Sequence, residues 1–289
     1  MIRSMTGFGR AEGTVSDKRL SVEVRSLNSK GFDLTLRTPG NYREKEVELR
    51  RLLGERIVRG KVDVVLSVES QAPEMRTTFD AGLAKAYYAQ LHALSTEIDP
   101  DATTDLMGFV LRMPEVARTA REEVDEQEWH AMQGVLDQAL AAFDAFRRAE
   151  GARLKEDLRS RLKHIGDLLT DVEGSDAGRR ERVRERISAR LEELAVEVDR
   201  DRFEQEMIYY LEKLDVNEEK VRLRAHCAYF DETMEGEQEQ GRKLGFISQE
   251  MGREINTLGA KANDAAIQKF VVRMKDELEK IKEQTMNVL

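Results

Sequence analysis

The sequence has very little cysteine and no long apolar run. Its 289 residues include one cysteine, Cys227, so no intramolecular disulfide can form and a reducing compartment is expected. No segment approaches the ~18 consecutive apolar residues typical of a membrane-spanning helix. The first residues also lack the apolar core of a signal peptide. Together these absences predict a cytoplasmic protein without a membrane partner.

Several signatures of common enzymes are missing as well. The chain has no Walker phosphate loop, no GxGxxG fingerprint, no Cys/His spacing of a zinc site and no GxSxG elbow. The sequence therefore gives no support for a nucleotide hydrolase, a dehydrogenase or a serine hydrolase. Cys227 is interpreted as a packing residue rather than a nucleophile, because it directly follows His226 and successive helical side chains point about 100° apart.

Charged residues are plentiful and unevenly distributed. They make up 36% of the chain and aromatics 6%, which is typical of a helix-rich protein with exposed charged faces. The net charge of −9 argues weakly against a nucleic-acid partner. Residues 1–71, however, hold 14 Lys and Arg against 10 Asp and Glu, a net of +4. An acidic protein can bind RNA through such a local basic surface.

Alternating apolar and polar residues predict a small N-terminal α+β domain. Gly7 and Gly9 would allow a bend or a close backbone approach in its first strand. The predicted strands cover residues 2–10, 19–27, 32–37 and 62–68, with a helix beginning at Asn41 and a further short strand near Arg76–Phe79.

From Asp80 onward the apolar spacing becomes helical. Two long helices, over residues 122–172 and from Val183 to Leu194, predict an antiparallel hairpin around a turn at Gly174–Gly178. The other predicted helices run from Leu83 to Ile98, over Asp105–Met113, over residues 203–234 with a break at an Asp215/Glu218 capping box, and over Ala265–Val288. The predicted class is α+β, with an N-terminal α+β domain (1–80), a helical hairpin region (81–200) and a C-terminal helical domain (201–289).

The segment from Gly241 to Asp264 combines several side chains that could bind a metal ion or a phosphate. Its apolar residues recur at helical spacing, and Gly259 is the expected stop of this helix. Glu250 and Glu254 lie one turn apart on one shoulder of the helix. The face opposite the apolar stripe presents Arg242, Gln249, Arg253 and Asn256.

The segment GRKLGFISQEMGREINTLGAKAND resembles the C-terminal signature of the YicC family of bacterial endoribonucleases. The opening MIRSMTGFGRAE resembles that family's N-terminal signature, and VEVRSLNSKGFDLTLR, RGKVDVVL and RLRAHCAYF match in order and spacing. The similarity is looser from about Ala72 to Asp201. It implies a divalent-metal-dependent endoribonuclease of bacterial RNA turnover, which cleaves single-stranded or structured RNA as a ring-like hexamer and works beside other RNA-decay enzymes.

The expected catalytic residues are His226, Glu250, Arg253 and Glu254. Glu250 and Glu254 would bind Mn²⁺ or Mg²⁺, which take oxygen ligands. Spacing alone fits equally a solvated helix flank with a Glu250–Arg253 ion pair. His226 would move a proton, although a single helical histidine is more often a partly buried polar residue.

The expected RNA-binding residues lie in both the N-terminal strands and the C-terminal helix. They are Arg3, Arg10, Arg25, Lys30, Arg37, Arg242, Gln249, Asn256 and Lys261. The cluster of arginines between Arg179 and Arg190 is interleaved with glutamates, so a solvated or inter-subunit face explains it about as well as RNA does. Two other functions stay open: a non-catalytic adaptor that presents RNA to another nuclease, and a purely structural helical scaffold.

Overall fold

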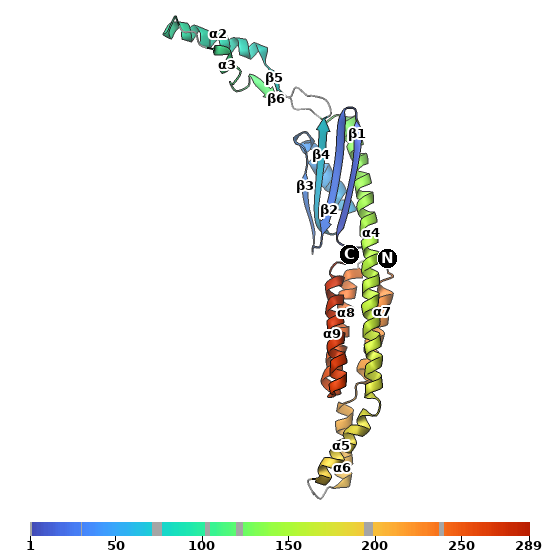
Figure 1. Cartoon of the computed structure of the whole chain (residues 1–289). Helices are drawn as coiled ribbons and strands as arrows, with labels where there is room; N and C mark the ends of the chain where they lie inside the picture. The colour runs from blue at the N-terminus through green and yellow to red at the C-terminus, as the bar shows by residue number, and fades with distance from the viewer. Residues whose placement is uncertain are drawn as a thin grey trace.

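The computed structural model describes residues 2–29, 31–70, 77–101, 105–119, 124–193, 199–236 and 240–289. Lys30, Arg76 and Leu194, which carried parts of the sequence predictions, lie outside these ranges. The molecule is elongated along one long helix, α4 (Glu126–Asp176). A β-sheet lies beside one half of α4, and a helical bundle lies beside the other half (Figure 1). The predicted α+β class is confirmed.

The sheet has four strands in the order β1-β2-β4-β3. These are β1 (Gly7–Val15), β2 (Lys18–Leu27), β3 (Phe32–Arg37) and β4 (Gly60–Ser70). Only the β3–β4 pair is parallel, because a 3-10 helix (Gly40–Lys45) and α1 (Glu46–Arg56) cross over between these strands. Apolar side chains on one face, including Val22, Val24, Val62 and Val64, pack with residues of α1 and α4, and the other face is open.

Glycines let α4 lie directly against strand β1. A Cβ atom on Gly7 would come within 2.4 Å of the Phe143 ring, and one on Gly9 within 2.2 Å of the Ala139 carbonyl oxygen. The close backbone approach predicted at these glycines is confirmed. The strand itself begins at Gly7 rather than at residue 2, because residues 2–5 take part in a different contact.

The two ends of the chain meet near the middle of α4 (Figure 1). The Met5 amide donates to the Asn287 carbonyl at 2.8 Å, and the Leu289 amide donates to the Arg3 carbonyl at 2.9 Å. The buried Arg147 of α4 donates to the carbonyl of Met5, which ties this junction to the long helix. The junction thus connects the sheet to the helical bundle.

The helical bundle packs α7 (Asn217–Thr233), α8 (Gln240–Ala262) and α9 (Ala265–Thr285) beside the second half of α4. The predicted hairpin takes another form. Helix α5 (Arg179–Glu193) continues beyond the bundle, where its Arg184 forms an ion pair with Glu204 of α6 (Arg200–Lys213). The apolar stripe in the second half of α4 is buried instead in the core shared with α7, α8 and α9.

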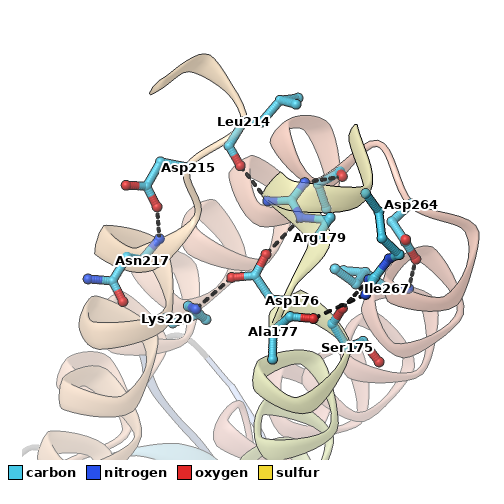
Figure 2. A network of polar contacts seen from close by, with 12 residues as sticks. Ser175, Asp176, Ala177, Arg179, Leu214, Asp215, Asn217, Lys220, Asp264 and Ile267 are labelled. Carbon is cyan, nitrogen blue, oxygen red and sulfur yellow. Dashed lines mark hydrogen bonds and ion pairs between the residues drawn. The ribbon is translucent and has the colours of Figure 1, made fainter. Parts of the chain in front are cut away.

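The buried Arg179 forms hydrogen bonds with three turns at the end of the bundle (Figure 2). The Arg179 guanidinium donates to the carbonyls of Ala262 and Leu214 and to the Asp176 carboxylate. Lys220 donates to the other oxygen of Asp176 at 2.8 Å. Burial alone would raise the pKa of Asp176, but hydrogen bonds from Lys220 and Arg179 outweigh burial and hold this pKa below its usual value. The arginine-rich start of α5 is therefore partly structural.

A small arm projects from the sheet (Figure 1). It contains β5 (Thr77–Phe79), α2 (Ala81–Ile98), α3 (Leu106–Val110) and β6 (Ala117–Thr119), and β5 pairs with β6. The predicted strand near residue 79 is confirmed, whereas its partner β6 was not expected. Helix α2 has no buried residue, and Leu94 and Ile98 of its apolar stripe are 52% and 76% exposed.

Three predicted helix boundaries in the C-terminal region need correction. Helix α8 does not stop at Gly259, where a Cβ would lie 3.0 Å from Val271 of α9, but continues to Ala262. Asn263, with φ of +41°, makes the turn instead. The break before α7 is confirmed, but the Asp215 carboxylate accepts from the Asn217 amide and no capping box forms. The last helix ends at Thr285.

Within the described ranges, no helix is both long and apolar enough to cross a bilayer.

Candidate functional site

Side-chain contacts set the alignment of α7 against α8. They are Lys261 Nζ to Glu219 Oε1 at 2.6 Å, Arg222 Nη1 to Glu254 Oε1 at 4.0 Å, and Lys243 Nζ to the centre of the Tyr229 ring at 4.6 Å. Residue numbers rise along one helix as they fall along the other, so the helices are antiparallel. His226 and Glu250, which lie between these contacts in sequence, therefore reach the same level. We call these eight residues the α7–α8 face.

The two carboxylates of α8 differ in environment. Glu254 is 8% exposed and faces the Arg222 guanidinium, so it is more enclosed than its predicted place on the shoulder of the helix implied. Glu250 is partly exposed and forms an ion pair with Arg253 at 3.0 Å. The expected intrahelical Glu250–Arg253 pair is thus present. Each carboxylate has a guanidinium beside it.

These carboxylates do not by themselves form a complete metal site. Among the described residues, no three His, Cys, Asp or Glu side chains lie close enough together to hold a metal ion. A further carboxylate on this face is Glu219, which is 4% exposed and whose Oε2 has no hydrogen-bond partner among the described residues. The donor chemistry suits a hard divalent cation that completes its shell with water and substrate phosphate oxygens.

His226 is half-buried on α7, and helical spacing places it on the same side of the helix as Glu219 and Arg222, which contact α8. Its neighbour Cys227 lies against the bundle core. Burial raises the pKa of the Cys227 thiol to about 12, an effect that the nearby Arg224 opposes only weakly. The thiol is therefore protonated near neutral pH, which agrees with its interpretation as a packing residue.

The solvent-facing side of α8 carries the predicted polar residues. Arg242, Gln249, Arg253 and Asn256 are all exposed there. Lys261 belongs instead to the α7–α8 face, where Glu219 holds it. Sequence reasoning missed Phe246, which is 59% exposed, and Lys243. A signal for Lys243 was available, because positions 243, 250, 254 and 261 fall within about 20° of one line along a helix.

The predicted basic strand residues divide between two places. Arg10, Arg25 and Arg37 lie on the open face of the sheet, where Arg25 stacks 5.7 Å from the centre of the Phe8 ring. Glutamates on the same face pair with Arg10 at 2.7 Å and with Arg25 at 2.6 Å, so the face is less basic than expected. Arg3 lies at the junction of the chain termini instead. Lys30 is outside the described residues.

The open sheet face and the α7–α8 face are far apart in one chain. The sheet lies along the first half of α4, and α7 and α8 lie along the second half (Figure 1). Helices α7 and α8 therefore carry His226, Glu250 and Glu254 beside the second half of α4, and the strand arginines lie beside the first half.

Comparison with known proteins identifies the family to which this chain belongs. Residues 2–156 match the family model described as Endoribonuclease YicC-like, N-terminal region, and residues 172–289 match Endoribonuclease YicC-like, C-terminal. The chain belongs to the YicC-like endoribonuclease family. It is 32% identical over 293 residues to a protein of Clostridioides difficile named "Probable endoribonuclease YicC", with both chains fully covered. A protein of Haemophilus influenzae with the same name is 29% identical over 289 residues, again covering both chains in full. The family resemblance seen in the sequence is confirmed.

Proposed function

We propose that this protein is an endoribonuclease and that RNA is cleaved at the α7–α8 face. The observation that carries this assignment is the enclosed Glu254 carboxylate opposite Arg222, at the same face as His226 and Glu250. Acidic side chains held beside arginine and histidine are suited to phosphodiester chemistry. The membership in the YicC-like family supports the same activity.

A divalent cation, Mn²⁺ or Mg²⁺, belongs to this proposal. Glu250 and Glu254 would hold it together with phosphate oxygens of the RNA and water, since the described residues supply no complete protein shell. When bound, such an ion stabilises the negative charge that develops at the scissile phosphate.

The remaining side chains have separate tasks. His226 would accept or deliver the proton that phosphodiester cleavage requires. Arg253, 75% exposed at its side chain, would contact non-bridging phosphate oxygens, and Arg242 would bind a more distant phosphate of the strand. Gln249 and Asn256 are exposed on the same side of α8 and would hydrogen-bond ribose or base edges.

The proposal also includes a cytoplasmic, ring-like homo-oligomer, with a hexamer as the family-based expectation. Its structural support is the apolar stripe of α2, where Leu94 and Ile98 are 52% and 76% exposed. In the ring that we propose, the sheet face of one subunit lies near the α7–α8 face of another.

The competing function is a non-catalytic adaptor that presents RNA to another nuclease. Both readings require RNA binding, but only the nuclease requires cleavage by the purified chain. The test is incubation of purified protein with an end-labelled structured RNA in Mn²⁺, in Mg²⁺ and in EDTA. We expect internal cleavage with a divalent ion and none in EDTA. RNA binding without cleavage in all three would support the adaptor, and failure to bind RNA at physiological salt would support a scaffold.

A further inference from the structure

A small cavity lies where α7 ends and α8 begins, next to the α7–α8 face. Its volume is about 220 Å³. Its lining residues come from both helices and the turn between them: Tyr229, Glu232, Thr233, Gly236, Gln240 and Lys243. The cavity thus shares Tyr229 and Lys243 with the proposed cleavage face.

Thr233, which lines this cavity, carries a buried polar group without a partner in the described part of the chain. The residue is 6% exposed, and its hydroxyl has no hydrogen-bond partner among the described residues. Helical threonines usually satisfy their hydroxyl locally, as Thr170 does by donating to the Gly166 carbonyl at 3.1 Å. A buried hydroxyl without a partner is destabilising, so a ligand that supplies a partner gains affinity.

Tyr229 and Lys243 provide the two contacts that a nucleotide needs. The Tyr229 residue is 44% exposed, which leaves ring surface on which a base can stack. The Lys243 ammonium, 4.6 Å from the ring centre, carries the positive charge that a phosphate seeks.

The polar lining is rich in acceptors. Gln240 donates its amide nitrogen to the Gly236 carbonyl, which leaves its side-chain oxygen to accept. The Glu232 carboxylate accepts only. Guanine matches this lining best, because its Watson–Crick edge presents adjacent N1–H and N2–H donors, whereas uracil presents one donor between two acceptors.

The cavity also lies close to the proposed cleavage position along α7. Tyr229 follows His226 by three residues, about 4.5 Å along the helix axis. A base stacked on Tyr229 would therefore belong to a nucleotide next to the phosphate at His226 and Glu250.

We propose that this cavity binds an unpaired guanine base of the RNA, adjacent to the scissile phosphate, and so selects the cleavage position. The inference rests on the proposed nuclease function for its biological role. The binding of guanine itself does not depend on catalysis and can be measured separately.

The first measurement is binding of GMP and of UMP to the full-length protein by isothermal titration calorimetry. We expect the wild type to bind GMP more tightly than UMP. Thr233→Val replaces the hydroxyl by a methyl group, and it should reduce the preference for GMP about three- to tenfold, as loss of one neutral hydrogen bond does. Thr170→Val removes a hydroxyl with a local partner outside the cavity and should leave the preference unchanged.

The second measurement maps cleavage positions on an RNA library with a randomised single-stranded segment. We expect guanine to be enriched at one fixed position beside the cut, and this enrichment to fall in Thr233→Val. Thermal unfolding should show that Thr233→Val is at least as stable as the wild type, because it removes an unsatisfied buried hydroxyl.

The outcomes separate the two claims. Equal binding of GMP and UMP by the wild type, or an unchanged preference in Thr233→Val, would overturn the guanine site while leaving the nuclease proposal standing. Selective GMP binding that Thr233→Val reduces, in a protein that cleaves no RNA, would support the site and reject the nuclease.

Discussion

Cys227 illustrates how burial decides the chemistry of one side chain. Because burial raises its pKa to about 12, very little thiolate is present at pH 7.5. We predict that the folded protein reacts with Ellman's reagent on the order of a thousandfold more slowly than a free thiol with a pKa near 8.5. Unfolding in guanidinium chloride should restore a fast reaction. Rapid labelling of the native protein would show that the thiol is accessible and ionised.

At the same scale, the sequence predicted which residues face solvent better than which are enclosed. The exposed positions of Arg242 and Arg253 follow from the helical period of α8 alone. The burial of Glu254 and the role of Thr233 do not, because both depend on how α7 is aligned against α8. This alignment comes from contacts between helices, which a single helix pattern does not encode.

Strand β1 and helix α4 depend on glycine for their close contact. Gly9→Ala would place a Cβ 2.2 Å from the Ala139 carbonyl oxygen, which neither backbone can accommodate without shifting. We predict a loss of about 1–3 kcal/mol in the free energy of unfolding, measured by urea titration.

The matched control is Gly134→Ala on α4, where a Cβ meets no atom within 4 Å. This exposed helical position should gain about 0.5–1 kcal/mol, because alanine favours the helix over glycine. If Gly9→Ala were as well tolerated as Gly134→Ala, the close contact between β1 and α4 would be wrong.

The open sheet face makes a prediction about RNA capture. Arg25→Glu with Arg37→Glu should weaken RNA binding and flatten its dependence on salt, because fewer counterions are released. Arg51→Glu with Arg56→Glu changes the same charge on α1, across the sheet from this face, and should have a smaller effect. Fluorescence anisotropy at several salt concentrations measures both. Equal effects of the two pairs would mean that only net charge matters.

The helices and strands show which features of the fold a local sequence pattern can predict and which it cannot. Apart from the bounds of β1, the sequence predicted the four strands of the main sheet and the break before α7, since each depends on nearby residues. It placed α4 and α5 in one hairpin because both carry apolar stripes joined by a short turn. Which segment covers a stripe is decided by distant parts of the chain, and here α9 and α7 cover the second half of α4 while the sheet covers the first half.

At the level of the whole molecule, the exposed apolar residues of the arm lead us to predict a homo-oligomer. Leu94 and Ile98 of α2 are 52% and 76% exposed, and exposed apolar residues on one helix face commonly mark a subunit contact. We expect light scattering to give a mass several times the 33.1 kDa of one chain, and Leu94→Lys with Ile98→Lys to lower it. Val47→Lys, at an isolated position on α1 that is 79% exposed, should not. A monomer mass for the wild type across micromolar concentrations would contradict the proposed ring.

The central claim is that the carboxylates of the α7–α8 face are needed for cleavage. Its most direct test is Glu250→Gln with Glu254→Gln, which keeps side-chain size but removes the charge that a hard cation needs. The control is Glu279→Gln with Glu283→Gln, which places the same change one turn apart on α9, away from this face. The measurement is the rate of cleavage of an end-labelled RNA, with RNA affinity and oligomer mass determined on the same samples.

We predict that the Glu250/Glu254 variant loses cleavage by about a hundredfold or more, as removal of a transition-state contact does, while its affinity and mass stay near those of the wild type. The Glu279/Glu283 variant should cleave normally. Full activity in the Glu250/Glu254 variant would contradict the account and place the chemistry elsewhere in the molecule.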